Sequence, residues 1–242
     1  MSKILAIANT AGGSGKTTSA RSIALAAAEY GKRTLLVDLD SRATLTFMQG
    51  VENPRLTALE VLRGSSPLEQ ASHLSAERYH FLPADSRLAL LDQQLQESEK
   101  LVKNFRSALS AVDSPFDLVV IDSASAVSAT NLLALQLSDF LVTPFLPNVT
   151  SARGVIQISR MRENTPATKW LGSLAIQQEL TSDYAQELAD FAPILGTAIP
   201  KSAQIAQAEL ENRSVLATHM SAPISEAYRE LTYFLLEDIF KG

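Results

Sequence analysis

Residues 3–38 read KILAIANTAGGSGKTTSARSIALAAAEYGKRTLLVD, and this stretch decides the fold. The short apolar run Lys3–Asn9 predicts a buried strand that ends in a glycine-rich turn. Lys16–Tyr30 contains strong helix formers with apolar residues at three- and four-residue spacing, and Gly31 then supplies a stop signal. Arg33–Asp38 predicts a second buried strand. Strand, helix and strand in this order make a βαβ unit, so we expect the two strands to be parallel.

The same alternation continues along the rest of the chain. Further strands are predicted at Tyr79–Pro83, Phe116–Asp122 and Phe140–Phe145 and, on weaker patterns, at Leu171–Gln177 and Ile194–Pro200. The segments predicted to be mainly helical are Ser86–Val112 and Ile224–Phe240. Repeated strand–helix alternation predicts an α/β fold, with a mainly parallel twisted sheet and helices on both faces. No repeat or long linker divides the chain, so we expect residues 1–242 to form a single domain.

Composition excludes several classes of protein. The chain has 242 residues, of which 46% are hydrophobic and 19% charged, which is enough to bury a sizeable core. A net charge of −5 argues against a protein that coats DNA over its whole surface, although it permits a local basic patch. The absence of cysteine excludes disulfides, thiolate zinc sites, iron–sulfur clusters and cysteine nucleophiles. No apolar stretch approaches 18 residues, so no transmembrane helix is expected, and the N-terminal apolar run is too short for a secretory signal.

The turn between the first strand and helix has the chemistry of a phosphate loop. Residues 10–18 read TAGGSGKTT. Glycines let consecutive backbone N–H groups curl around phosphate oxygens, and the helix adds the positive end of its dipole. We expect Lys16 to reach the β- and γ-phosphates and the Thr17 hydroxyl to ligate Mg²⁺. The predicted phosphate-binding residues are Gly12, Gly13, Ser14, Gly15, Lys16, Thr17 and Thr18.

The loop departs from the strict pattern G-x-x-x-x-G-K-[ST], because Thr10 stands where that pattern has its first glycine. The alternative interpretation is an ordinary glycine turn that caps a helix.

Acidic residues follow two of the predicted strands. Asp38 and Asp40 end the second strand, and Asp122 ends the apolar run FDLVVID. The carboxyl ends of parallel strands meet at one edge of a sheet, where ligands of α/β proteins bind. Asp122 therefore has the position of a Walker B acid that holds Mg²⁺. The alternative is an aspartate that merely starts a loop or caps a helix.

Together, GGSGKTT, VDLD and FDLVVID resemble the motifs of the ParA/MinD family, which are P-loop NTPases with a deviant Walker A motif. Weaker likenesses in Ala198–Lys201, in Gln207–Glu209 and in AYREL at Ala227–Leu231 extend the resemblance over essentially the whole chain. It implies an ATPase that binds ATP and Mg²⁺, forms an ATP-sandwich homodimer and hydrolyses ATP slowly. It also implies a cytoplasmic, nucleoid-associated protein.

The same resemblance assigns roles to individual residues. It gives catalysis to Lys16, Asp38 and Asp40, with the two acids positioning or activating the attacking water. It places Thr17, Asp122 and Asp38 around Mg²⁺, and it places Pro200 beside the adenine.

One signature residue is missing. The family signature is K-G-G-x-G-K-[ST], and its first lysine reaches the partner's phosphates across the dimer, but this chain has Ala11 there. Ser41 and Arg42 replace the usual proline and glutamine after the second acid. The McdA-type subgroup, which spaces carboxysomes along the nucleoid, also lacks the signature lysine. We therefore expect a carboxysome-positioning ATPase, with plasmid or chromosome partition as the alternative and a nucleotide-switched adaptor with little hydrolysis as a second class.

Another cation is needed to neutralise the triphosphates across such a dimer. Arg153 is the basic residue of Pro147–Gly154, a segment expected at the same sheet edge as the phosphate loop. A guanidinium suits bidentate phosphate contact, so we expect Arg153 to bind ATP in trans, with Arg42 as the second candidate. The alternative is that Arg153 is an exposed arginine without a role.

The expected partners are a second copy of the chain, non-specific nucleoid DNA and a cargo adaptor that stimulates hydrolysis. The candidate DNA contacts are Arg213, Arg229 and Lys241. A membrane is not expected, because Glu237 and Asp238 lie on the polar face of the last predicted helix. The three histidines, at positions 73, 80 and 219, show no metal-ligand spacing.

Overall fold

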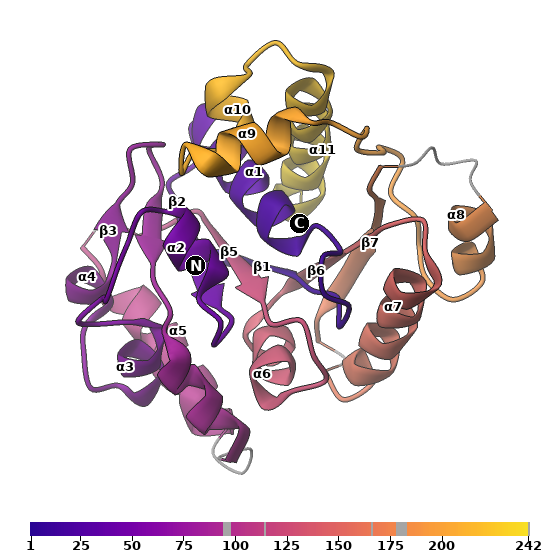
Figure 1. Ribbon diagram of the computed structural model, residues 1–242. Coiled ribbons are helices and arrows are strands. Elements are labelled where there is room, and N and C mark those ends of the chain that lie inside the picture. Colours follow the sequence, from indigo (N-terminus) through magenta and orange to yellow (C-terminus); the bar gives the residue numbers. More distant parts are fainter. Residues whose placement is uncertain (94–97, 114, 166, 178–182, 242) are drawn as a thin grey trace.

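The computed structural model describes residues 1–93, 98–113, 115–165, 167–177 and 183–241 (Figure 1). Within them, seven strands form one sheet in the order β3-β4-β2-β5-β1-β6-β7. The strands are β1 (Lys3–Ile7), β2 (Thr34–Leu39), β3 (His73–Leu74), β4 (His80–Leu82), β5 (Leu118–Ser123), β6 (Phe140–Phe145) and β7 (Lys169–Ala175). Neighbouring strands are parallel except for β3 and β4, which are antiparallel. The mainly parallel sheet predicted from the sequence is confirmed.

Helices cover both faces of the sheet (Figure 1). They are α1 (Lys16–Glu29), α2 (Thr44–Met48), α3 (Ala58–Arg63), α4 (Leu68–Ala71), the 3₁₀ helix η1 (Ser86–Gln93), α5 (Ser98–Ala111), α6 (Ala129–Leu137), α7 (Val149–Arg162), α8 (Asp183–Ala189), α9 (Gln204–Leu210), α10 (Val215–Thr218) and α11 (Pro223–Phe240). Buried side chains of α1 and α11 pack on one face, and those of α3, α5 and α6 pack on the other.

Alternation along the central strands separates these two cores. In β2, Leu36 packs with α1 and α11, whereas Leu35 and Val37 pack with α3, α5 and α6. The register pairs Asp38 of β2 with Asp122 of β5. Since alternate residues of a strand share a face, both acids lie on the α1 side of the sheet.

One predicted strand is wrong. Ile194–Pro200 forms only two isolated bridges, Ser173 to Ile194 and Ile176 to Ile199, instead of a strand. The bridges are parallel to β7, and Gly196 and Pro200 interrupt the segment. Proline has no N–H for a ladder, and glycine weakens extended structure, which explains why a full strand does not form.

The predicted helical segments are confirmed with adjustments. Ser86–Val112 divides into η1 and α5, and its residues 94–97 lie outside the described residues. The closing helix α11 packs on the core through a buried apolar stripe that includes Tyr228, Leu231 and Leu235. Among the described residues, every helix is too short or too polar to span a bilayer.

Candidate nucleotide-binding site

The glycine-rich loop joins β1 to α1 at the carboxyl edge of the sheet. Gly13 and Gly15 have φ angles of 69° and 89°, in the left-handed region that glycine adopts at little cost. No heavy atom from outside the loop lies within 4 Å of where a Cβ would stand at Gly12 or Gly13. The loop therefore presents an open backbone surface just before the first turn of α1, which suits an anion.

Lys16 begins α1, and its side chain lies along this loop. It is only 4% exposed. Its Nζ donates to the Ala11 carbonyl oxygen at 2.8 Å and to Ser14 Oγ at 3.3 Å. Burial lowers the pKa of Lys16 to about 8, although the negative charges of Asp122 and Asp40 act in the opposite direction. A phosphate against this ammonium would favour its charged form.

Asp122 lies at the tip of β5 next to the loop, and it is fully buried. Burial raises the pKa of Asp122 well above its ordinary value, and the nearby charge of Asp38 adds to this, whereas the Thr17 hydroxyl lowers it. Among the described residues, Oδ1 of Asp122 has no hydrogen-bond partner. A buried, unpaired carboxylate oxygen beside a hydroxyl fits Mg²⁺, which prefers oxygen ligands. Thr17 and Asp122 are therefore the residues that would hold this ion.

Asp38 is engaged differently from the way its sequence position suggests. Its Oδ2 accepts hydrogen bonds from the backbone N of Thr46 at 2.9 Å and from Thr46 Oγ1 at 2.7 Å, and its Oδ1 accepts one from Asp40 N at 3.0 Å. Thr46 Oγ1 also accepts a hydrogen bond from Ala84 N. Oδ2 thus fastens β2 to α2, whereas Oδ1 holds the backbone directly after β2. Burial raises the pKa of Asp38 to about 6.

Asp40 is almost buried and is held by Arg42. Its carboxylate accepts hydrogen bonds from the backbone N, Nε and Nη2 of Arg42, at 3.0, 3.1 and 2.7 Å respectively. The Nη2 group also donates to Ser125 Oγ at 2.9 Å. Ser125 follows β5, so this one guanidinium joins the loops that leave two adjacent strands.

A buried asparagine, to which sequence reasoning gave no role, anchors the phosphate loop to α7. Asn9 donates through Nδ2 to the carbonyl oxygens of Pro144 and Ser151, and its Oδ1 accepts from Ala11 N at 2.8 Å. A Cβ at Gly154 of α7 would lie 1.9 Å from Asn9 Oδ1 and 3.0 Å from Ala11 N. The signal in the sequence was a polar residue at the end of an otherwise apolar strand.

The second half of the chain also supplies neighbours to the loop. A Cβ at Gly15 would lie 3.5 Å from the Ile176 side chain, and Ile176 is bridged to Ile199, the residue before Pro200. Thr18 Oγ1 lies 3.4 Å from Glu209 of α9, within hydrogen-bond distance. The late segments predicted for the adenine side therefore lie beside the phosphate loop.

Arg153 is exposed in the second turn of α7, directly before Gly154. In the described part of the chain it has no hydrogen bond or ion pair. A Cβ on its neighbour Gly154 would stand 3.0 Å from the backbone N of Ala11, the position where the signature lysine is missing. Whether Arg153 binds a phosphate stays a prediction.

The three basic residues predicted to contact DNA differ in their side-chain partners. Arg229 pairs with Glu29 at 2.7 Å and donates to the Met220 carbonyl oxygen, and Lys241 pairs with Glu237 at 2.7 Å. Arg213 is exposed, and no side-chain partner is found for it among the described residues. Those residues also contain no cluster of three histidine, aspartate or glutamate side chains that could hold a metal ion.

The chain is similar to known proteins over most of its length. Residues 2–169 match the profile of a family described as an AAA domain. The chain is 30% identical over 238 residues to the chromosome-partitioning ATPase Soj of Thermus thermophilus, covering 94% of this chain and 92% of the relative. The structure of cobyrinic acid a,c-diamide synthase from Mycobacterium smegmatis with bound ADP and magnesium is 29% identical, with a TM-score of 0.83 over 98% of this chain and 95% of that chain. The fold of apo McdA from Cyanothece is also similar, with 23% identity and a TM-score of 0.82 over 98% of this chain and 100% of that chain.

Proposed function

This chain belongs to the ParA/MinD family of AAA-domain ATPases, and we propose that it binds ATP with Mg²⁺ and hydrolyses it slowly. One observation carries the proposal: Lys16, Thr17 and the unpaired Asp122 oxygen meet at the glycine loop. Lys16 supplies the charge for the β- and γ-phosphates, and Thr17 and Asp122 supply oxygen ligands for the metal. When bound, Mg²⁺ neutralises phosphate charge during hydrolysis. The protein's share is to hold these groups in place and to orient a water through Asp40.

The first test is Lys16→Ala. We expect a loss of affinity for ATP of about a hundredfold or more, because the substitution removes the ammonium that lies along the loop. Titration of a fluorescent ATP analogue measures this loss. Lys100→Ala, on the exposed face of α5, is the matched control and should bind like the wild type. A Lys16→Ala protein with wild-type affinity would contradict the phosphate-loop assignment.

We further propose that two copies form an ATP-dependent sandwich dimer, with Arg153 of each copy reaching the partner's phosphates. Ala11 has no charge to neutralise the two triphosphates. This role is supported by the exposed guanidinium of Arg153, which stands next to Gly154, the residue of α7 that packs against the phosphate loop. The dimer then binds nucleoid DNA without sequence preference, with Arg213 as the basic residue best placed for a phosphate contact.

The cargo that we propose is a carboxysome, recruited through an adaptor protein that stimulates hydrolysis. The missing signature lysine at Ala11 supports this over the other cargoes. Plasmid or chromosome partition is the second candidate, favoured by the likeness to Soj over nearly the whole chain. A nucleotide-switched adaptor with little hydrolysis is a further candidate. Phosphate release measured with and without DNA separates that adaptor from the two ATPase functions.

A further inference from the structure

Arg42 holds the carboxylate that should orient the attacking water. Two side-chain nitrogens of Arg42 and its backbone N donate to Asp40, so both Asp40 oxygens accept from the same residue. The Asp40 side chain is 8% exposed, whereas that of Arg42 is 59% exposed. A solvent-facing guanidinium is thus paired to a nearly buried acid, and a second anion can approach it from solvent.

The contact to Ser125 places this guanidinium between the loops that follow two strands of the candidate site. Nη2 of Arg42 bridges the loop after β2 to the loop after β5, and these strands carry Asp38 and Asp122 side by side. The charge of Arg42 also helps to lower the pKa of Lys16, so the two cations lie close to each other. Among the described residues, Nη1 of Arg42 has no hydrogen-bond partner.

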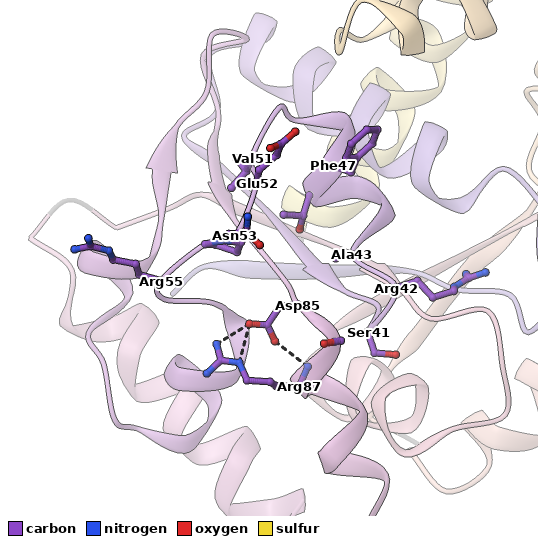
Figure 2. A pocket seen from close by; sticks show the side chains of 13 residues that line it. Ser41, Arg42, Ala43, Phe47, Val51, Glu52, Asn53, Arg55, Asp85 and Arg87 are labelled. Atoms are coloured by element: carbon purple, nitrogen blue, oxygen red, sulfur yellow. Dashed lines mark hydrogen bonds and ion pairs between the residues drawn. The ribbon is translucent and has the colours of Figure 1, made fainter.

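Two other arginines near Arg42 do not contact the acids of the candidate site. Arg42, Arg55 and Arg87 all line a cavity of about 760 Å³ beside the segment between β2 and α2. Figure 2 shows Arg42 on the side of this cavity opposite to Arg55. Arg87 pairs with Asp85 at 2.6 Å and with Glu60 at 2.8 Å. Of these three, only Arg42 contacts an acid of the candidate site.

We propose that Arg42 is a γ-phosphate ligand in its own chain, and that ATP and Asp40 compete for it. The inference rests on the proposed binding of ATP. A terminal phosphate carries more negative charge than a carboxylate and offers more acceptor oxygens, so it attracts the guanidinium more strongly. When the guanidinium of Arg42 moves to the γ-phosphate, Asp40 Oδ2 loses its two side-chain donors and becomes free to accept a hydrogen bond from water, while Oδ1 keeps the backbone N of Arg42. ADP lacks the γ-phosphate and leaves the Arg42–Asp40 pair intact.

The test compares the affinities of a non-hydrolysable ATP analogue and of ADP, both with Mg²⁺, by calorimetry. Arg42→Ala should weaken binding of the ATP analogue at least about tenfold and leave ADP binding unchanged. Asp40→Asn should strengthen binding of the ATP analogue relative to ADP, because it removes the competing charge. The Asp40→Asn/Arg42→Ala double variant should lose that gain, because the guanidinium for which ATP and Asp40 compete is then absent. Arg87→Ala, in the same cavity, should behave like the wild type.

Equal losses for both nucleotides in Arg42→Ala, or an unchanged ratio of the two affinities, would overturn this inference alone. A gain from Asp40→Asn that persists without Arg42 would also overturn it. A wild-type protein that binds neither nucleotide would overturn the proposed function, and this inference with it.

Discussion

At the scale of single residues, Asp38 gives the protein a defined dependence on pH. Burial raises the pKa of Asp38 from 3.8 to about 6, against the effect of its hydrogen bonds from Thr46 and Asp40. A raised pKa in the folded state means that the folded protein holds its proton more tightly than the unfolded chain does. The associated stability is present at low pH and is lost as the pH rises through about 6.

We expect Asp38→Asn to abolish this loss of stability at rising pH, because asparagine does not titrate. Between pH 5 and pH 8, the free energy of unfolding of the variant should rise relative to the wild type by about 1 kcal/mol. Urea denaturation in EDTA, without nucleotide, measures the difference. The exposed Asp113→Asn variant controls for general surface charge. A difference between Asp38→Asn and wild type that stays constant over this range would contradict the burial argument.

At the scale of elements, the packing of α7 against the phosphate loop reverses a common rule. Replacing a glycine inside a helix by alanine normally adds about 1 kcal/mol of stability. At Gly154, however, the new Cβ would lie 1.9 Å from Asn9 Oδ1, and Asn9 is fixed by three hydrogen bonds. We expect Gly154→Ala to lower the free energy of unfolding by about 1–3 kcal/mol and to weaken ATP binding.

Chemical denaturation and nucleotide titration check this expectation. The Asn9→Ala/Gly154→Ala double variant is the sharper test, because removing the Asn9 side chain removes the shorter contacts and leaves only the one to Ala11 N at 3.0 Å. The cost of Gly154→Ala should then largely disappear in the Asn9→Ala background. Fully additive effects of the two substitutions would show that the contact does not connect α7 to the loop.

At the scale of the whole molecule, the prediction concerns association. Arg153→Ala should reduce the dimer fraction severalfold in the presence of Mg²⁺ and a non-hydrolysable ATP analogue. Binding of ATP to the monomer should remain, because Lys16 is untouched. Light scattering coupled to size-exclusion chromatography measures the dimer. Arg160→Ala, on the same helix, is the control, and an unaffected dimer in Arg153→Ala would remove Arg153 from the interface.

The sequence was sufficient for the features that depend on local pattern. Phe140–Phe145 is β6 to the residue, and Lys16–Tyr30 differs from α1 by one residue. Apolar runs and glycine stops act over a few positions, so they can be interpreted without knowledge of the fold. The loop and Asp122 were placed at one sheet edge for the same reason, since parallel strands end together.

The contacts that bring distant segments together were not predictable in the same way. Asn9 lies against Gly154, and Thr18 lies against Glu209, only because the folded sheet and helices place them side by side. The composition of Ile194–Pro200 suits extended backbone and therefore predicts a strand. A segment that forms only isolated bridges has the same composition, so the sequence does not distinguish the two. The sequence makes Arg42 a candidate for a phosphate contact in trans, whereas the structure shows its contact with Asp40 of the same chain.

The register between β2 and β5 also limits how this chain can change in length. Asp38 pairs with Asp122. Both lie on the α1 side, because each follows by two residues a side chain of that core, Leu36 in β2 and Val120 in β5. Deleting a single residue within β5 would turn Asp122 to the opposite face and exchange the apolar side chains between the two cores. Insertions and deletions among related sequences should therefore fall in the connecting loops, while the central strands keep the same length.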